Sequence, residues 1–193
     1  MLCNVNVLGQ ATPTARFMSG REFAALLDGA PPDLGALDDV QQLLHSHTVA
    51  LPSFAPHGGP FTHRAGQVLR AGEAIALQAL PPGQRSALAA LCCAQITAWL
   101  VLQLRPASAA AKVVVEGPLA HNALYLGLLQ ALLPGHQCQA STDAMEVTAR
   151  GTWMLSRWPV PTTAHSLQAA PRYELNALDE LQGYHAAWLN ALH

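Results

Sequence analysis

Residues 112–135, KVVVEGPLAHNALYLGLLQALLPG, decide the fold class, because a strand, a tight turn and a helix follow one another within them. The β-branched run at 112–115 is short and apolar, which predicts a parallel strand buried on both faces. Gly117-Pro118 then turns the chain, and leucines spaced four residues apart form one stripe of a helix over 119–133. This order is typical of α/β domains with a mainly parallel sheet.

The remaining chain supplies further helices and short strands. Periodicity and turn residues predict a strand and turn at Asn4–Pro13 and a strand at Gln137–Ala140. They predict five more helices: from Ser19 or Gly20 to Leu27, and at Ala36–His45, Gln84–Leu104, Ala144–Arg157 and Tyr173–Leu192. Thr48–Arg70 predicts an ordered loop or irregular hairpin between two apolar runs, and Pro159–Pro171 an irregular segment. We expect residues 1–193 to form a single domain.

Charge is scarce in this chain. Only 11% of residues are charged and 51% are apolar, against roughly 25% charged in an average soluble domain. We therefore expect another domain, a companion chain or a second copy to cover part of the surface. The net charge of −2 gives no electrostatic reason to expect nucleic acid as a partner.

The cysteines indicate a reducing compartment. Cys3, Cys92, Cys93 and Cys138 show no CxxC spacing, so buried free thiols explain them better than zinc or disulfides. The first residues also lack the pattern of a signal peptide. These features predict a cytoplasmic protein.

One segment is apolar enough to raise the question of a membrane. Leu88–Leu104 is marginally long enough to span a bilayer, but Gln95, Thr97 and Gln103 interrupt it. A helix buried inside a layered domain explains the segment better, so we expect no membrane association.

The strand–turn–helix stretch is also where a ligand could bind. Gly117 would lie at the carboxyl edge of the sheet, facing a helix amino end, a geometry that suits the phosphates or ribose of a nucleotide. Pro118 suits the first helical turn, and Asn122, one turn in, could face a purine or ribose. Gly20 similarly stands at a predicted helix start. By pattern alone, a tight turn, a surface asparagine and a plain helix cap explain these residues better than a ligand does.

Other chemical motifs are weaker. His45, His47, His57 and His63 match no common metal-ligand spacing, so we predict no metal held by the protein itself. No Walker loop, GxGxxG, GxSxG elbow or convincing cysteine nucleophile occurs. The residues therefore predict no catalytic group in this chain.

Several segments, in this order, resemble the carboxy-terminal domain of FGGY carbohydrate kinases across nearly the whole chain. They are ATPTARFMSGREFAALL, LPSFAPHGGPFTHRAG, the long apolar helix after Pro82, VVVEGPLAHNALYLGLLQALLPG and EVTARGTWMLSRW. The fourth is the most similar, to a Gly-Gly-x-x-x-Asn motif followed by a helix and a short strand. The last is similar to the family's Ala-x-Gly-Ala-Ala helix.

The resemblance implies an α/β fold of the actin-like ATPase, ribonuclease-H-like kind, with a mixed sheet flanked by helices. It implies that ATP, with Mg²⁺, lies between this domain and an amino-terminal domain that holds the sugar. Gly20 would then lie near the terminal phosphates, and Gly117, Pro118 and Asn122 would line the adenosine pocket. Gly151 would allow close helix packing near the nucleotide.

Some features depart from the family's pattern. Pro118 stands where a second glycine is usual and removes a backbone amide, and Arg70 stands near a point where a glycine is usual. The family's first phosphate loop, sugar contacts and general-base aspartate belong to its amino-terminal half, and we find no counterpart for them here. We therefore expect the nucleotide-binding half of a sugar kinase, inactive alone; the alternative is a non-catalytic binding or assembly module derived from such a kinase.

Overall fold

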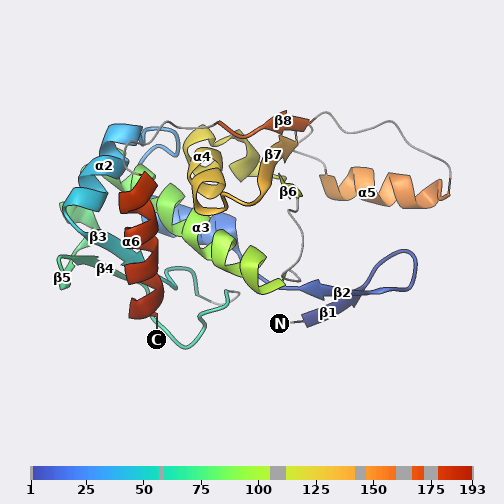
Figure 1. Cartoon of the computed structure of the whole chain (residues 1–193), viewed down its shortest axis with the longest axis horizontal. Coiled ribbons are helices and arrows are strands. Elements are labelled where there is room, and N and C mark those ends of the chain that lie inside the picture. The colour runs from blue at the N-terminus through green and yellow to red at the C-terminus, as the bar shows by residue number, and fades with distance from the viewer. Residues whose placement is uncertain are drawn as a thin grey trace.

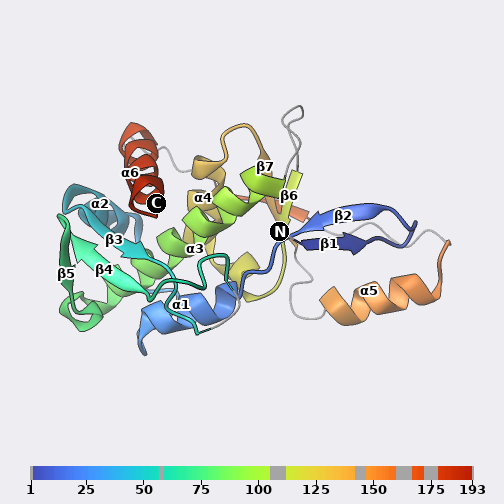
Figure 2. The same ribbon diagram turned by 90° about the horizontal axis from the view of Figure 1, so that it is seen from below.

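A long central helix organises the computed structural model, which describes residues 2–56, 59–104, 112–141, 147–159, 167–171 and 178–192. Helix α3 (Pro82–Leu104) packs against α1 (Ser19–Leu27), α2 (Leu37–His45) and α4 (Ala123–Leu132). Figures 1 and 2 show these helices around α3, with small sheets at two ends of the molecule. The predicted helices at these positions are confirmed to within a few residues.

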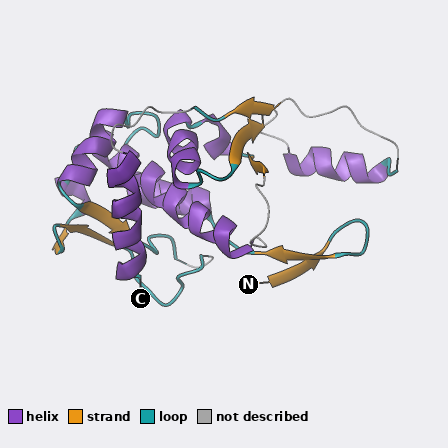
Figure 3. Cartoon of the chain, in the orientation of Figure 1, coloured by secondary structure: helices purple, strands orange, loops and turns teal. Residues whose placement is uncertain are grey.

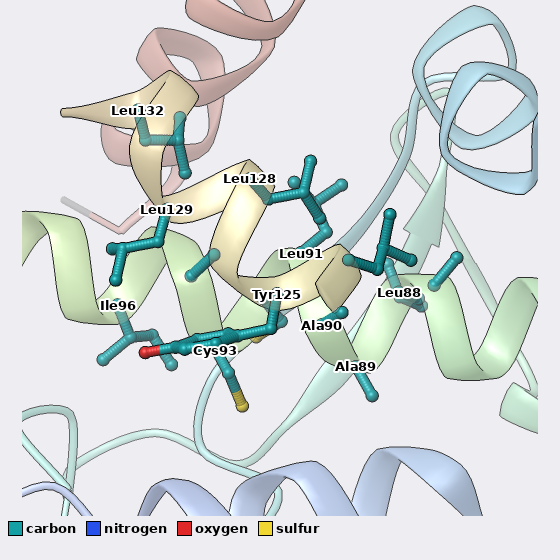
Figure 4. Close-up of a cluster of buried hydrophobic side chains, with 14 of the residues drawn as sticks. Leu88, Ala89, Ala90, Leu91, Cys93, Ile96, Tyr125, Leu128, Leu129 and Leu132 are labelled. Carbon is teal, nitrogen blue, oxygen red and sulfur yellow. The ribbon is translucent and has the colours of Figure 1, made fainter. Parts of the chain in front are cut away.

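The core forms around α3 because its apolar residues face every direction. Every residue from Ser86 to Ile96 is buried, as expected of a helix that is apolar all round. Alanines and cysteines alternate there with leucines, so neighbouring helices can approach closely. Figure 4 shows the cluster between α3 and α4, where Tyr125, Leu128 and Leu129 lie over Cys93 and Ile96.

Helix α3 is also long and apolar enough, by length and composition, to cross a membrane. However, 61% of its most apolar 18-residue window is buried within the fold. Core helices of water-soluble folds pass the same test of length and hydropathy. The burial favours the buried-helix interpretation of this segment.

The region predicted as an irregular hairpin is an antiparallel sheet with a long connection. Strand β3 (Thr48–Leu51) pairs with β4 (Gln67–Arg70), and β4 pairs with β5 (Glu73–Ile75). A buried carboxylate holds the connection: the two Glu22 carboxylate oxygens accept backbone N–H groups of Phe54 and Ala55, at 2.9 and 2.8 Å. The segment between β3 and β4 is thus fixed to α1.

A second sheet contains the stretch that decided the fold class. Strand β6 (Lys112–Val115) runs parallel to β7 (Gln137–Ser141), which confirms the predicted parallel pairing, and α4 connects them. Strand β8 (Leu167–Ala169), within a segment predicted to be irregular, pairs antiparallel to β7. The sheet is therefore mixed. Figure 3 shows its strands near the middle of the molecule, well separated from β3, β4 and β5 at one end.

One prediction for this sheet is wrong. We expected residues 112–115 to be buried on both faces, but Lys112 and Val114 are exposed while Val113 and Val115 are half-buried. The physical reason is position: among the described strands β6 is the outermost of a sheet whose neighbouring strand β7 contacts α4, so Val113 and Val115 face the core while Lys112 and Val114 face away from it.

The two ends of the chain relate differently to this core. Strands β1 (Leu2–Val5) and β2 (Ala11–Thr14) form the predicted strand-turn segment as a hairpin. Figures 1 and 2 show this hairpin and α5 (Val147–Ser156) standing away from the core. In contrast, α6 (Leu178–Ala191) packs against α2, α4 and β3.

The thiols are distributed largely as predicted. Cys92, Cys93 and Cys138 are buried, Cys3 is exposed, and all four are free. Burial raises the pKa of the Cys92 and Cys93 thiols well above the ordinary value, and raises that of Cys138 to about 11. The buried cysteines therefore remain protonated and unreactive at neutral pH.

Stability should fall below neutral pH because of a histidine on α6. His185 is buried and stacks on Trp188, with ring centroids 5.5 Å apart, and its Nδ1 has no hydrogen-bond partner among the described residues. Burial lowers the pKa of His185. Below pH about 6.5 the unfolded chain takes up a proton on this histidine more readily than the folded chain does. Protonation of His185 therefore leaves the free energy of unfolding unchanged above that pH and lowers it as the pH falls.

Urea unfolding at several pH values tests this expectation. The wild type should lose stability on acidification by up to about 1.4 kcal/mol per pH unit more than His185→Phe, which keeps a ring on Trp188. Because the other histidines are common to both proteins, the difference isolates His185. Parallel pH profiles would contradict the assignment.

Candidate nucleotide-binding site

Gly117, two residues after the end of β6, has a backbone conformation that few residues other than glycine adopt. Its φ is 78° and its ψ is −167°, a region of backbone space essentially restricted to glycine. No described atom lies within 4 Å of the position that a Cβ would occupy. The backbone at the end of this strand is therefore open for a ligand to approach closely.

Pro118 begins a short 3-10 helix, Pro118–His121, rather than the α-helix predicted from residue 119. It is exposed and has no N–H, as a first helical position permits. The α-helix starts at Ala123 instead, because Asn122 interrupts the run and caps α4. The turn at the strand end is thus longer than the sequence suggested.

Asn122 has a structural role in addition to any role toward a ligand. Its Oδ1 accepts the Tyr125 N–H at 2.8 Å, which caps α4. Its Nδ2 donates to the Pro32 carbonyl at 3.1 Å, and the Ser86 hydroxyl donates to the same carbonyl at 3.0 Å. Asn122 therefore ties the turn after β6 to the segment after α1. The predicted contact with a purine or ribose stays a prediction.

Gly20 and Gly151 are also open to their surroundings. Gly20 lies exposed in the first turn of α1, and no described atom lies within 4 Å of a Cβ built there or at Gly151. The close packing implied for Gly151 is therefore not formed among the described residues, because α5 stands away from the core (Figure 1). No hydrogen bond between described residues joins either glycine to Gly117.

The described residues offer open glycine backbone at Gly117, Gly20 and Gly151, but no cluster of metal-ligating side chains. An open strand end beside a following turn lets phosphate or ribose approach the main chain. Within the described ranges, no three His, Cys, Asp or Glu side chains lie close enough to share a metal ion. His57, one of the histidines considered for a metal, lies outside those ranges.

A large apolar groove lies elsewhere, and no local pattern in the sequence predicted it. Its volume is about 860 Å³, and Leu44, Val49, Leu69, Tyr184 and Trp188 contribute to its walls. At the rim of the groove, Nε2 of His45 lies 3.5 Å from Oε2 of Glu180. These residues come from α2, β3, β4 and α6, so only the packing of distant segments brings them together.

Comparison with known proteins places the chain in a family. The family model for the carbohydrate kinase FGGY, C-terminal domain, matches residues 1–165, while none of the curated proteins matches the chain. The fold is similar to the crystal structure of a carbohydrate kinase from Novosphingobium aromaticivorans, with a TM-score of 0.73 and 23% sequence identity. That alignment covers 99% of this chain and 39% of that one, so the chain spans well under half of the kinase's length. This chain belongs to the FGGY carbohydrate kinase family and corresponds to its carboxy-terminal domain.

Proposed function

We propose that this chain is the nucleotide-binding half of an ATP-dependent carbohydrate kinase, in which phosphoryl transfer runs from ATP to a sugar hydroxyl. Family membership supports the proposal, and the observation that carries it is the open backbone at Gly117. The finer fold assignment, actin-like and ribonuclease-H-like, belongs to the same proposal, as does a cytoplasmic location.

In this proposal the chain contributes binding and orientation. Adenosine would lie against the Gly117 backbone, beside the turn that Asn122 holds in place, and the terminal phosphates would lie near the amino end of α1 at Gly20. The Mg²⁺ ion that accompanies ATP neutralises charge on the phosphates when it is bound. The chain's own residues position the nucleotide, which is a large part of phosphoryl-transfer catalysis.

Calorimetric titration with ATP and Mg²⁺ tests the proposed site. Gly117→Ala should weaken ATP binding about tenfold or more, because a Cβ both strains this φ and occupies the space beside the strand end. Gly135→Ala is the matched control, since Gly135 is equally open but has no positive φ. Circular dichroism checks that both variants are folded. Equal ATP affinity in the two variants would remove Gly117 from the site.

Catalysis should be absent from the purified chain. Transfer needs an acceptor sugar and a base held against the terminal phosphate, and the sequence assigns neither to these residues. We expect no sugar-dependent ATP turnover in a coupled assay across a panel of sugars. Measurable turnover by this chain alone would contradict the expectation.

A second candidate is a non-catalytic binding or assembly module derived from such a kinase. The observation that favours it is the commitment of the Asn122 side chain to Tyr125 and Pro32, together with the amide missing at Pro118. The same titration separates the two: heat of binding with ATP and Mg²⁺ favours the kinase half, and its absence at high nucleotide concentration favours the module.

A further inference from the structure

Ser86, on α3, is a buried polar side chain one hydrogen bond removed from the candidate nucleotide site. It is 1% exposed, and its hydroxyl donates to the Pro32 carbonyl at 3.0 Å. The Asn122 Nδ2 donates to the same carbonyl at 3.1 Å. A carbonyl oxygen has two lone pairs, so it can accept both donors. The central helix and the turn after β6 therefore meet at one backbone oxygen.

The segment that carries this oxygen is fixed to the start of α3. The Arg85 guanidinium donates to the Asp28 carbonyl at 3.0 Å. Farther along the segment, a Cβ built on Gly35 would lie 2.5 Å from the backbone nitrogen of Ala87, so the two backbones are in close contact. With Ser86 between them, three successive residues of α3 hold the segment between α1 and α2. The carbonyl that accepts both donors thus has a defined position.

The internal hydrogen bonds of Asn122 use half of its amide. Its Oδ1 accepts the Tyr125 N–H at 2.8 Å, and its Nδ2 donates to Pro32. A primary amide has two N–H groups and two lone pairs on oxygen, so one N–H and one lone pair lie outside these two bonds. Because the nitrogen faces a carbonyl and the oxygen faces an amide, the side chain has one orientation. The remaining N–H and lone pair therefore have fixed directions.

We infer that Ser86 is a positioning residue of the nucleotide site: it holds the Pro32 carbonyl, and this carbonyl orients the Asn122 amide toward the ligand. This role rests on the proposed function, in which adenosine lies beside the turn that Asn122 holds in place. Ser86 is buried, so it acts through Pro32 and not by touching the nucleotide. A polar group that is already oriented binds a ligand more tightly than one that must be ordered on binding.

Calorimetric titration of single and double variants with ATP and Mg²⁺ tests this role. Ser86→Ala should weaken ATP binding about fivefold in the wild-type background. In the Asn122→Ser background it should change the affinity by less than about twofold, because serine still caps α4 but has no amide for the carbonyl to orient. Ser46→Ala is the matched control. It also removes a hydroxyl that donates to a backbone carbonyl, that of Gln42 at 2.7 Å, and it should leave ATP affinity unchanged.

The side-chain NH₂ signals of Asn122 report its orientation without any nucleotide. In ¹H–¹⁵N spectra of the free chain these signals are assigned by their loss in Asn122→Ser. They should shift in Ser86→Ala and stay in place in Ser46→Ala. Unshifted signals in Ser86→Ala would overturn the role of Ser86, as would a change in ATP affinity that is the same in both backgrounds.

The two measurements also separate this role from the proposed function. A wild type that binds no ATP would refute the proposed function and, with it, any role of Ser86 toward a nucleotide. A wild type that binds ATP, with Asn122 signals that ignore Ser86→Ala, would refute only the role of Ser86.

Discussion

Replacing Trp188 by alanine should lower the free energy of unfolding by about 3–5 kcal/mol, enough to unfold a marginally stable domain. Trp188 is 1% exposed and is among the largest fully buried side chains. Its indole N–H donates to the Ala50 carbonyl at 2.9 Å, and its ring meets Phe61 edge-on at 6.2 Å. The side chain thus connects α6 to β3 and to the segment between β3 and β4.

Two further variants make this expectation specific. Trp188→Phe should cost less, because it keeps a six-membered aromatic ring in the core and loses the five-membered ring with its N–H donor. Trp153→Ala should change stability by less than about 0.5 kcal/mol, because Trp153 is 46% exposed on α5. Chemical denaturation measures all three. Equal costs for Trp188 and Trp153 would contradict the packing of α6 on the core.

Removing the Glu22 carboxylate should destabilise the fold by about 3–5 kcal/mol in Glu22→Ala and somewhat less in Glu22→Gln. Glu22 is 3% exposed, and each carboxylate oxygen accepts one backbone N–H, from Phe54 and from Ala55. Alanine leaves both donors buried and unpaired. Glutamine keeps one acceptor oxygen but turns an NH₂ group toward the other donor.

Hydrogen exchange gives a local test of the same contact. The Phe54 and Ala55 amides should exchange much faster in Glu22→Gln than in the wild type, while amides in the middle of α3 should change only with global stability. Glu73→Gln, on the exposed strand β5, serves as a control that alters neither. Unchanged exchange at Phe54 and Ala55 would show that Glu22 does not hold this segment.

The positions of the helices followed from local sequence signals. The apolar run at Ser86–Ile96 required burial on all sides, and Pro82 marked the start of α3. The parallel pairing of β6 with β7 followed from a helix between two short strands. Local hydrophobic periodicity carries this information, so the sequence is sufficient for it.

The candidate site was predictable only in part. Gly117 was identified because a glycine between a strand and a helix start lets a ligand approach the backbone, whereas its positive φ is a finding of the structure. The hydrogen bond from Asn122 to Pro32 joins residues 90 positions apart, so no local pattern could predict it. Glu22 gave only the signal of an ordinary charged residue in a short helix, although it is buried beneath a segment more than thirty residues away.

The sequence by itself determined the central buried helix and the glycine at the strand end, because each depends on residues close together in the chain, and it determined the family through the order of several short segments along the chain. The tertiary structure decided which polar groups are used internally, since Asn122 and Glu22 find their partners only when distant segments pack. It also decided that β6 is the outermost of the described strands in its sheet, with Val114 exposed. A β-branched run has the same local pattern at the centre of a sheet and at its edge, and only the neighbouring strands distinguish the two.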